Sequence, residues 1–163
     1  WAVLETALRG ACEQFVESRI REGENLKLDL IEKLDGMLTD VAAIEKRSPE
    51  ILQAYRTKLT EKVKELLSDT QLEESRIATE VILYADKICT DEETVRLHSH
   101  IESMKQTLQT GGSIGRKLDF IAQEMNREAN TILSKANDLE TSNLAINLKT
   151  EIEKVREQIQ NIE

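Results

Sequence analysis

The chain has 163 residues, of which 33% are charged and only 3% aromatic, and its formal net charge is −9. So few aromatic residues, with a single proline, are unlike a β-sheet protein and typical of long helices packed as bundles or hairpins. The acidic balance counts against a simple phosphate-binding surface, although it leaves room for a local basic patch or an acidic metal site.

The first 68 residues are expected to form a long antiparallel helical hairpin within an all-α fold. Apolar residues recur at helical spacing from Leu4 to Phe15 and from Leu30 to Ile44, with Gly23 as a break or a weak point between them. Ser48-Pro49-Glu50 predicts the turn of the hairpin, because Ser caps a helix, Pro fits its first turn and Glu suits its positive end. A second arm would carry Leu52, Tyr55, Leu59, Val63 and Leu66.

A compact helical domain is expected for residues 69–163, after a second break at Ser68-Asp69-Thr70. Thr90 and Glu93 have the spacing of a capping box, which opens one of its helices. Gly111 to Gly115 predicts a flexible loop. Four apolar stripes at spacings of three and four predict the helices of this domain: Ile77 to Ile88, Leu97 to Leu108, Leu118 to Ile132, and Ala145 to Ile162.

Cys12 and Cys89 lie far apart in helical patterns, which favours a reduced, cytosolic setting over a disulfide framework or a zinc motif. No apolar run is long enough to cross a bilayer, so no membrane partner is expected. The chain begins at Trp1 inside a helical pattern, and we expect it to be a fragment of a longer protein.

His100 is the first candidate for chemistry. On a helix it shares a face with Glu93 and Arg96, at offsets of zero, three and seven. One interpretation makes His100 a metal ligand or a general acid and base, because imidazole titrates near neutral pH. The other makes it a surface histidine in an ordinary helix-surface network, and the spacing alone leaves both open.

Two carboxylates, Glu124 and Glu128, lie one helical turn apart. Such a pair can hold a hard divalent cation, and Mg²⁺ or Mn²⁺ would suit oxygen ligands. The same pair is also common on solvated helices, and Arg127 beside it could simply neutralise the charge.

Polar groups surround these carboxylates on the predicted helix. Arg116 and Lys117 open the helix, which is the unfavourable end for cations, so they are candidates for phosphate contact or only for solubility. The neighbouring face is unusually rich in amides and predicts a polar site. The amide-rich end of the chain, residues 156–163, predicts a cavity, an assembly interface or only a frayed helix end. The basic candidates are Arg116, Lys117, Arg127 and Lys135, and the amide-rich face carries Asp119, Gln123, Asn126 and Asn130.

Long stretches of the sequence resemble the YicC-like endoribonuclease family. They are RLHSHI at residues 96–101, GRKLDFIAQEMNREANTILSKA at 115–136 and the terminal KTEIEKVREQIQNIE. Further similarity extends upstream, through Arg76 to Val81 and to the REG-like stretch at Arg21 to Gly23, so the resemblance covers essentially the whole chain.

The resemblance implies a bacterial cytoplasmic homo-oligomer, a hexameric ring, that cleaves single-stranded or structured RNA with a divalent metal, Mn²⁺ or Mg²⁺. It implies no small-molecule cofactor, and an N-terminal α/β domain that this chain lacks. We accordingly expect three residues to take part in catalysis and metal binding, and five basic residues to contact RNA. The first set is His100, Glu124 and Glu128; the second is Arg96, Arg116, Lys117, Arg127 and Lys135.

Two other hypotheses stay open. The hairpin and the terminal helix could make a non-catalytic adaptor or oligomeric scaffold that helps other nucleases engage RNA. Alternatively, the chain could be a purely structural coiled-coil protein, which predicts no RNA affinity.

Overall fold

The computed structural model describes residues 1–66 and 74–162, and these residues form helices and no strand. The all-α prediction is therefore confirmed. The predicted break at Ser68-Asp69-Thr70 lies outside the described residues. Helix α1 spans Ala2–Leu66, α2 Glu74–Ile88, α3 Asp91–Thr110, α4 Gly115–Lys135 and α5 Leu139–Ile159.

The predicted turn at Ser48-Pro49-Glu50 is wrong, because α1 runs unbroken through Pro49. A proline inside a helix costs roughly 3 kcal/mol relative to alanine, mostly through one lost hydrogen bond and a clash with the preceding turn. Packing on both sides of Pro49 offsets this cost: Val41 and Ile44 are buried in the core, and Tyr55 packs against α2. Gly23 does not break α1 either.

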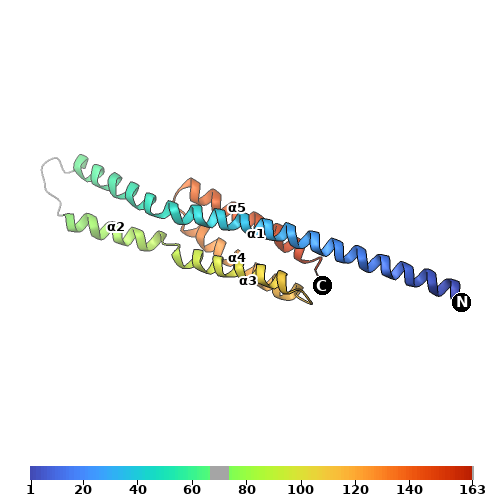
Figure 1. Cartoon of the computed structure of the whole chain (residues 1–163). Helices are drawn as coiled ribbons and strands as arrows, with labels where there is room; N and C mark the ends of the chain where they lie inside the picture. The colour runs from blue at the N-terminus through green and yellow to red at the C-terminus, as the bar shows by residue number, and fades with distance from the viewer. Residues whose placement is uncertain (67–73, 163) are drawn as a thin grey trace.

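The hairpin exists, but its two arms are α1 and α2. Figure 1 shows α2 lying along the C-terminal part of α1 and running in the opposite direction. The rings of Tyr55 and Tyr84 stack across the two helices, with centroids 3.7 Å apart and planes inclined by 11°. The second predicted stripe therefore lies within α1, and its Tyr55 faces α2.

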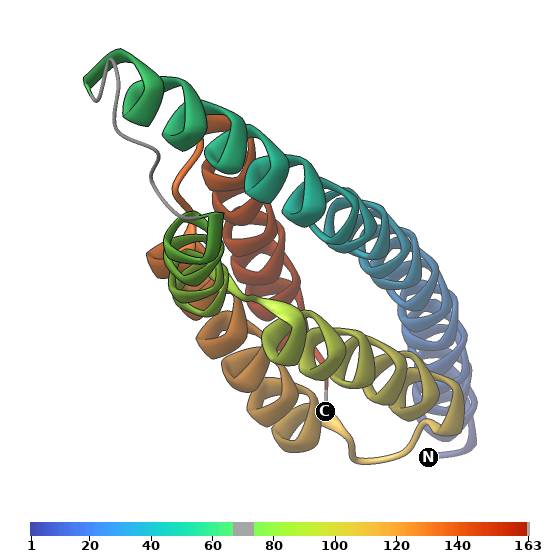
Figure 2. The same ribbon diagram turned by 90° about the vertical axis from the view of Figure 1, so that its left-hand side faces the viewer.

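The core lies where the middle of α1 packs with α3, α4 and α5, as Figure 2 shows from the end of the bundle. The predicted stripes of these helices are confirmed as buried, and Ile162 packs against their edge. Residues Leu30 to Ile44 of α1 lie in the same core as the three later helices. A domain boundary at residue 68 stays a prediction. The largest fully buried side chains include Leu30, Leu34, Met37, Ile44, Leu97, Ile101, Met104, Leu118, Met125, Ile132, Leu148 and Ile152.

The N-terminal part of α1 projects beyond this bundle (Figure 1). Its predicted apolar stripe is helical, yet Leu4, Leu8 and Phe15 are 62%, 64% and 66% exposed. No part of the chain that the structure describes covers them. Among the described helices, none combines the length and the apolar character that spanning a membrane requires.

The loops that join the bundle helices fix their ends. Thr90 is the N-cap residue of α3, but its side chain makes no capping hydrogen bond, so the predicted capping box does not form. Glu93, the other residue of the predicted box, pairs with Lys135 and Arg96 instead. Gly111 and Gly112 have φ values of 68° and 87°, which favour glycine, and they carry the chain from α3 into α4.

Candidate functional site

Helices α3 and α4 lie antiparallel, and ion pairs between them form a seam that holds most of the predicted site residues. Arg96 Nε lies 3.0 Å from Glu128 Oε1, and Lys135 Nζ lies 3.0 Å from Glu93 Oε2. These two pairs fix the register of the helices. One turn further along both helices, that register places His100 opposite Glu124.

The carboxylates at one end of this seam are buried and fully paired. The side chains of Glu93 and Glu128 are 6% and 8% exposed. Arg96 donates to Glu92 and Glu93 as well as pairing with Glu128, and the hydrogen bond with Glu128, followed by that with Glu92, raises the pKa of the Arg96 guanidinium. Buried carboxylates need such partners, because an unpaired buried charge is costly.

Arg96 and Lys135 therefore act within the fold. Lys135 Nζ donates to both oxygens of Glu93 and to the backbone oxygen of Cys89 at 2.8 Å. Their predicted RNA contacts stay untested, but both cations already neutralise carboxylates of the same chain.

The other end of the seam is open. His100 and Glu124 are both half-buried, and each retains access to solvent. Arg127 lies three residues after Glu124 on α4, and its guanidinium is 3.9 Å from the Glu124 carboxylate. This ion pair is loose, and the arginine side chain is 76% exposed. An imidazole facing a carboxylate can take up or release a proton as a general base or acid, and an exposed cation beside them can stabilise negative charge on a ligand.

The predicted metal site is not visible as a cluster of ligand side chains in the part of the chain that the structure describes. Among the described residues no group of three or more His, Cys, Asp or Glu side chains could hold a metal ion. Glu128 is nearly buried and already binds Arg96, so a cation there would have to displace the arginine. The assignment of metal to Glu124, Glu128 and His100 stays a prediction.

The outer face of α4 carries the remaining basic candidates. Arg116 and Lys117 are exposed at its first turn, and no carboxylate in the described part of the chain lies within ion-pair distance of either. Phe120, one turn beyond Arg116, is 63% exposed. Lys135 lies at the far end of α4, about 28 Å from Arg116 along the axis. The five predicted RNA-contact residues therefore do not form one patch.

The amide-rich face of α4 lies against α5. Asn126 Nδ2 donates to Glu153 Oε1 at 2.7 Å, and Arg156 Nε donates to Asp119 Oδ1 at 3.0 Å. Gln123 also donates to Asp119, at 2.6 Å. The hydrogen bond from Arg156, supported by that from Gln123, lowers the pKa of the Asp119 carboxyl. The bonds of Asn126 and Asp119 join α4 to α5, whereas Gln123 is exposed and bonds within α4.

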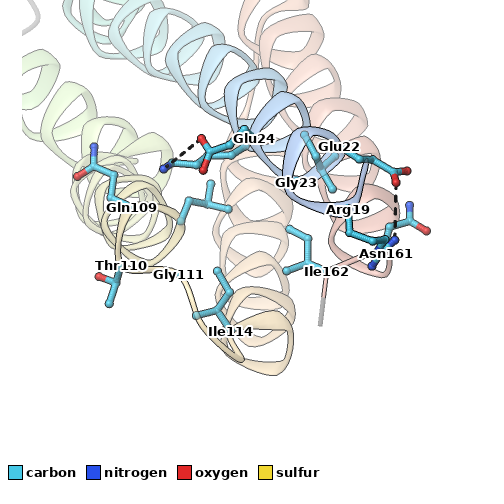
Figure 3. Close-up of a pocket in the computed structure, with 13 residues that line it drawn as sticks. Arg19, Glu22, Gly23, Glu24, Gln109, Thr110, Gly111, Ile114, Asn161 and Ile162 are labelled. Carbon is cyan, nitrogen blue, oxygen red and sulfur yellow. Dashed lines mark ion pairs between the residues drawn. The ribbon is translucent and has the colours of Figure 1, made fainter. Parts of the chain in front are cut away.

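A cavity of about 430 Å³ opens where the C-terminus of the chain meets α1 and the end of α3. Figure 3 shows Ile114 and Ile162 among its lining residues, together with the Arg19–Glu22 ion pair. Glu24 and Lys27, which also line the cavity, form a second ion pair. Asn161 and Ile162 line it, so the predicted cavity at the chain end is confirmed for these residues. Glu163 lies outside the described residues.

Sequence reasoning missed two residues of this region. Phe120 falls off the apolar stripe of α4, and helical spacing alone would have placed it on the outer face with Arg116 and Arg127. Glu93 was expected to cap a helix, but it is a buried ion that holds α3 to α4. Its partner Lys135 is 42 positions away, so local spacing gave no signal.

Comparison with known proteins gives consistent matches. Residues 44–163 match the family model described as Endoribonuclease YicC-like, C-terminal. The chain is 45% identical over 164 residues to the probable endoribonuclease YicC of Clostridioides difficile (strain 630), covering 100% of this chain and 56% of that relative. It is 37% identical over 160 residues to the protein of the same name in Haemophilus influenzae, covering 98% of this chain and 55% of that relative. The chain thus spans about half the length of the curated relatives it matches.

Proposed function

The chain belongs to the YicC-like endoribonuclease family, and from that membership we propose that it is the C-terminal helical part of an enzyme that cleaves RNA phosphodiester bonds. One observation carries the proposal: the 45% identity to a probable endoribonuclease extends over the whole chain. The matched region spans the whole α3–α4 seam. The activity, the RNA substrate and the partners of the whole protein are part of the proposal.

We place the reaction at the open end of the seam. His100 takes the proton of the attacking hydroxyl, or returns one to the departing oxygen, because it is half-buried and yet reaches solvent. Glu124 occupies the facing position on α4 in the register set by the Arg96–Glu128 pair, and in this proposal it orients the imidazole once RNA is bound. Arg127 stabilises the charge that develops on the phosphate, since its loose pair with Glu124 leaves it able to turn to a ligand.

Metal dependence on Mn²⁺ or Mg²⁺ belongs to the same proposal. Glu124 is the carboxylate free to meet such an ion, because Glu128 is held by Arg96. A bound divalent ion would supply charge stabilisation to the scissile phosphate.

We further propose that the whole protein is a homo-oligomer, a hexamer in the bacterial cytoplasm. The exposed apolar stripe on the N-terminal part of α1 supports association, since large exposed apolar patches mark contact surfaces. Assembly would bring several α4 helices to one RNA and so offset the net charge of −9.

The test uses the full-length protein and a 5′-labelled single-stranded RNA, with and without EDTA. His100→Ala is expected to lower the cleavage rate by about 10²-fold, the contribution of a general acid or base. His98→Ala is the matched control, because His98 is a half-buried histidine on another face of the same helix. It is expected to cleave at the wild-type rate.

The same experiment separates the competing hypotheses. Cleavage that EDTA abolishes supports the metal-dependent enzyme. RNA that is bound but left intact supports the adaptor or scaffold instead. A protein that neither binds nor cleaves RNA supports the purely structural coiled coil, and equal rates for the two histidine variants remove His100 from the site.

A further inference from the structure

The outer face of α4 carries an exposed aromatic ring between two arginines. Phe120 is 63% exposed, Arg116 precedes it by one turn and Arg127 follows it by two. At 100° per residue the three side chains point within roughly 40° of one another. They form a strip, named here the α4 outer strip, along the helix axis.

Phe120 takes no part in the folding of the bundle. The residues that bury α4 are on its opposite side, among them Leu118, Ala122 and Met125, each 0% exposed. Phe120 does not belong to the core cluster or to the residues packed on its edge. In a chain with only two phenylalanines, a ring held in solvent on a well-packed helix lacks a structural role within the described fold.

The cations of the strip are available to a ligand. Neither Arg116 nor its neighbour Lys117 has an ion-pair partner within the described ranges, and Arg127 has only the 3.9 Å contact with Glu124. By contrast, Arg96, Lys135 and Arg156 form ion pairs of 3.0 Å with carboxylates. The α4 outer strip is therefore locally positive in a protein whose net charge is −9.

We propose that the α4 outer strip binds single-stranded RNA, with one base stacked on Phe120 and the phosphates on either side contacting Arg116 and Arg127. This inference rests on the proposed function and specifies how the substrate is held. Stacking on an aromatic ring is possible only for a base that is not paired in a duplex, so the strip selects single-stranded segments. Helix geometry places the two arginines about 6 Å and about 10.5 Å from Phe120 along the axis, on opposite sides of the ring.

Charge complementarity favours RNA over a protein partner at this strip. The neighbours of the ring at helical spacings of three and four are the charged or polar residues Arg116, Lys117, Gln123 and Glu124, so no contiguous apolar patch of α4 surrounds it. A protein interface would need such a patch around its central aromatic residue. A polyanion with flat apolar bases matches both features of the strip. The strip also leads along α4 to Glu124, where the seam with His100 opens.

The test measures the affinity of the full-length protein for a short fluorescein-labelled single-stranded RNA, in EDTA so that cleavage does not interfere. Phe120→Ala and Phe120→Leu are each expected to weaken binding by at least about fivefold, whereas Phe120→Tyr keeps the wild-type affinity. Val95→Ala is the control, because Val95 is 65% exposed on α3 and lies outside the strip. Wild-type affinity in Phe120→Leu overturns the proposal, since an apolar contact without stacking would then suffice.

Two further measurements identify the stacked base and the phosphates. An RNA whose nucleotides lack their bases is expected to bind the wild type more weakly than the intact RNA. This loss of affinity is expected to be smaller in Phe120→Ala, which has no ring for a base to stack on. The plot of log affinity against log salt has a negative slope, and Arg127→Gln is expected to make it less steep by about one. Phe120→Ala is expected to leave the slope unchanged.

The outcomes separate this inference from the function on which it rests. If the wild type binds RNA and the Phe120 variants bind equally well, the stacking site is overturned and the proposed function stands. If the wild type itself fails to bind single-stranded RNA, both are overturned.

Discussion

Lys135 Nζ donates to both carboxylate oxygens of Glu93, at distances of 3.1 and 3.0 Å, and to the backbone oxygen of Cys89 at 2.8 Å. One ammonium group thus joins the last turn of α4, the first turn of α3 and the residue that follows α2. Because Glu93 is only 5% exposed, this contact neutralises a charge inside the fold. It also sets the register on which the position of His100 opposite Glu124 depends.

Replacing Lys135 by methionine should destabilise the protein. Lys135→Met keeps the length of the side chain but leaves the buried Glu93 with Arg96 alone, and it leaves the Cys89 oxygen unpaired. An unsatisfied buried group costs about 1–3 kcal/mol, and we expect a loss of unfolding free energy in that range, measured by urea denaturation at pH 7.

A double-mutant cycle checks the origin of that loss. If the pair is responsible, adding Glu93→Gln to Lys135→Met should cost less than the sum of the two single changes, because contacting residues are coupled. If the two changes are strictly additive, the ion pair is not the origin of the loss. If Lys135→Met is as stable as the wild type but binds RNA weakly, the prediction that Lys135 contacts RNA is supported instead.

Asp119 should stabilise the contact of α4 with α5 in a pH-dependent way. The hydrogen bond from Arg156 lowers the pKa of Asp119 below its ordinary value of 3.8. A lowered carboxyl pKa contributes stability above the unfolded value, and this contribution is lost as pH falls through the folded one. Asp119→Asn should therefore unfold at a lower urea concentration than the wild type at pH 7, with a smaller difference below pH 3.8.

Asp86→Asn is the control for Asp119. Asp86 is an exposed carboxylate on α2 with no ion-pair or hydrogen-bond partner in the part of the chain that the structure describes. Its replacement should leave the unfolding midpoint close to that of the wild type at pH 7. A difference between Asp119→Asn and the wild type that stays constant down to acid pH would contradict the role of the ion pair.

Asp40 should show the opposite dependence. Burial between α1 and α5, reinforced by the nearby charge of Glu151, raises the pKa of Asp40 above 3.8. The folded state then holds the proton more tightly than the unfolded chain, so this group costs stability as pH rises through its folded pKa. Asp40→Asn should increase the unfolding free energy at pH 7 and lose this advantage in acid. A decrease at pH 7 would show that the carboxylate has a favourable contact.

The apolar spacing of the sequence predicted which side chains of the helical bundle are buried, although the stripe from Leu4 to Phe15 is exposed, and the polar residues were harder to place. Leu97 to Leu108 and Leu118 to Ile132 are buried as predicted, because an amphipathic stripe has few alternatives to facing a core. The polar face of α4 predicted a binding site, whereas Asn126 bonds to Glu153, a residue 27 positions away. The spacing of residues within one helix does not show which residues of a distant segment they will contact. The same limit applied to Glu93 and its partner at the end of α4.

The course of α1 through Pro49 gives the sharpest difference between sequence pattern and structure. If Ser48 capped a new helix and Pro49 occupied its first turn, Pro49→Ala would bring little gain, and Ser48→Ala would cost about 1 kcal/mol. In the unbroken α1, Pro49 is exposed in a helix interior and Ser48 makes no cap.

Pro49→Ala should therefore raise the unfolding free energy by as much as about 3 kcal/mol, because alanine restores a backbone donor and relieves the clash with the preceding turn. Ser48→Ala should be neutral or slightly stabilising, since alanine is the better helix former. Urea denaturation of the two variants at pH 7 checks both expectations. A destabilised Ser48→Ala beside an unchanged Pro49→Ala would restore the turn at this position and divide α1 into two helices.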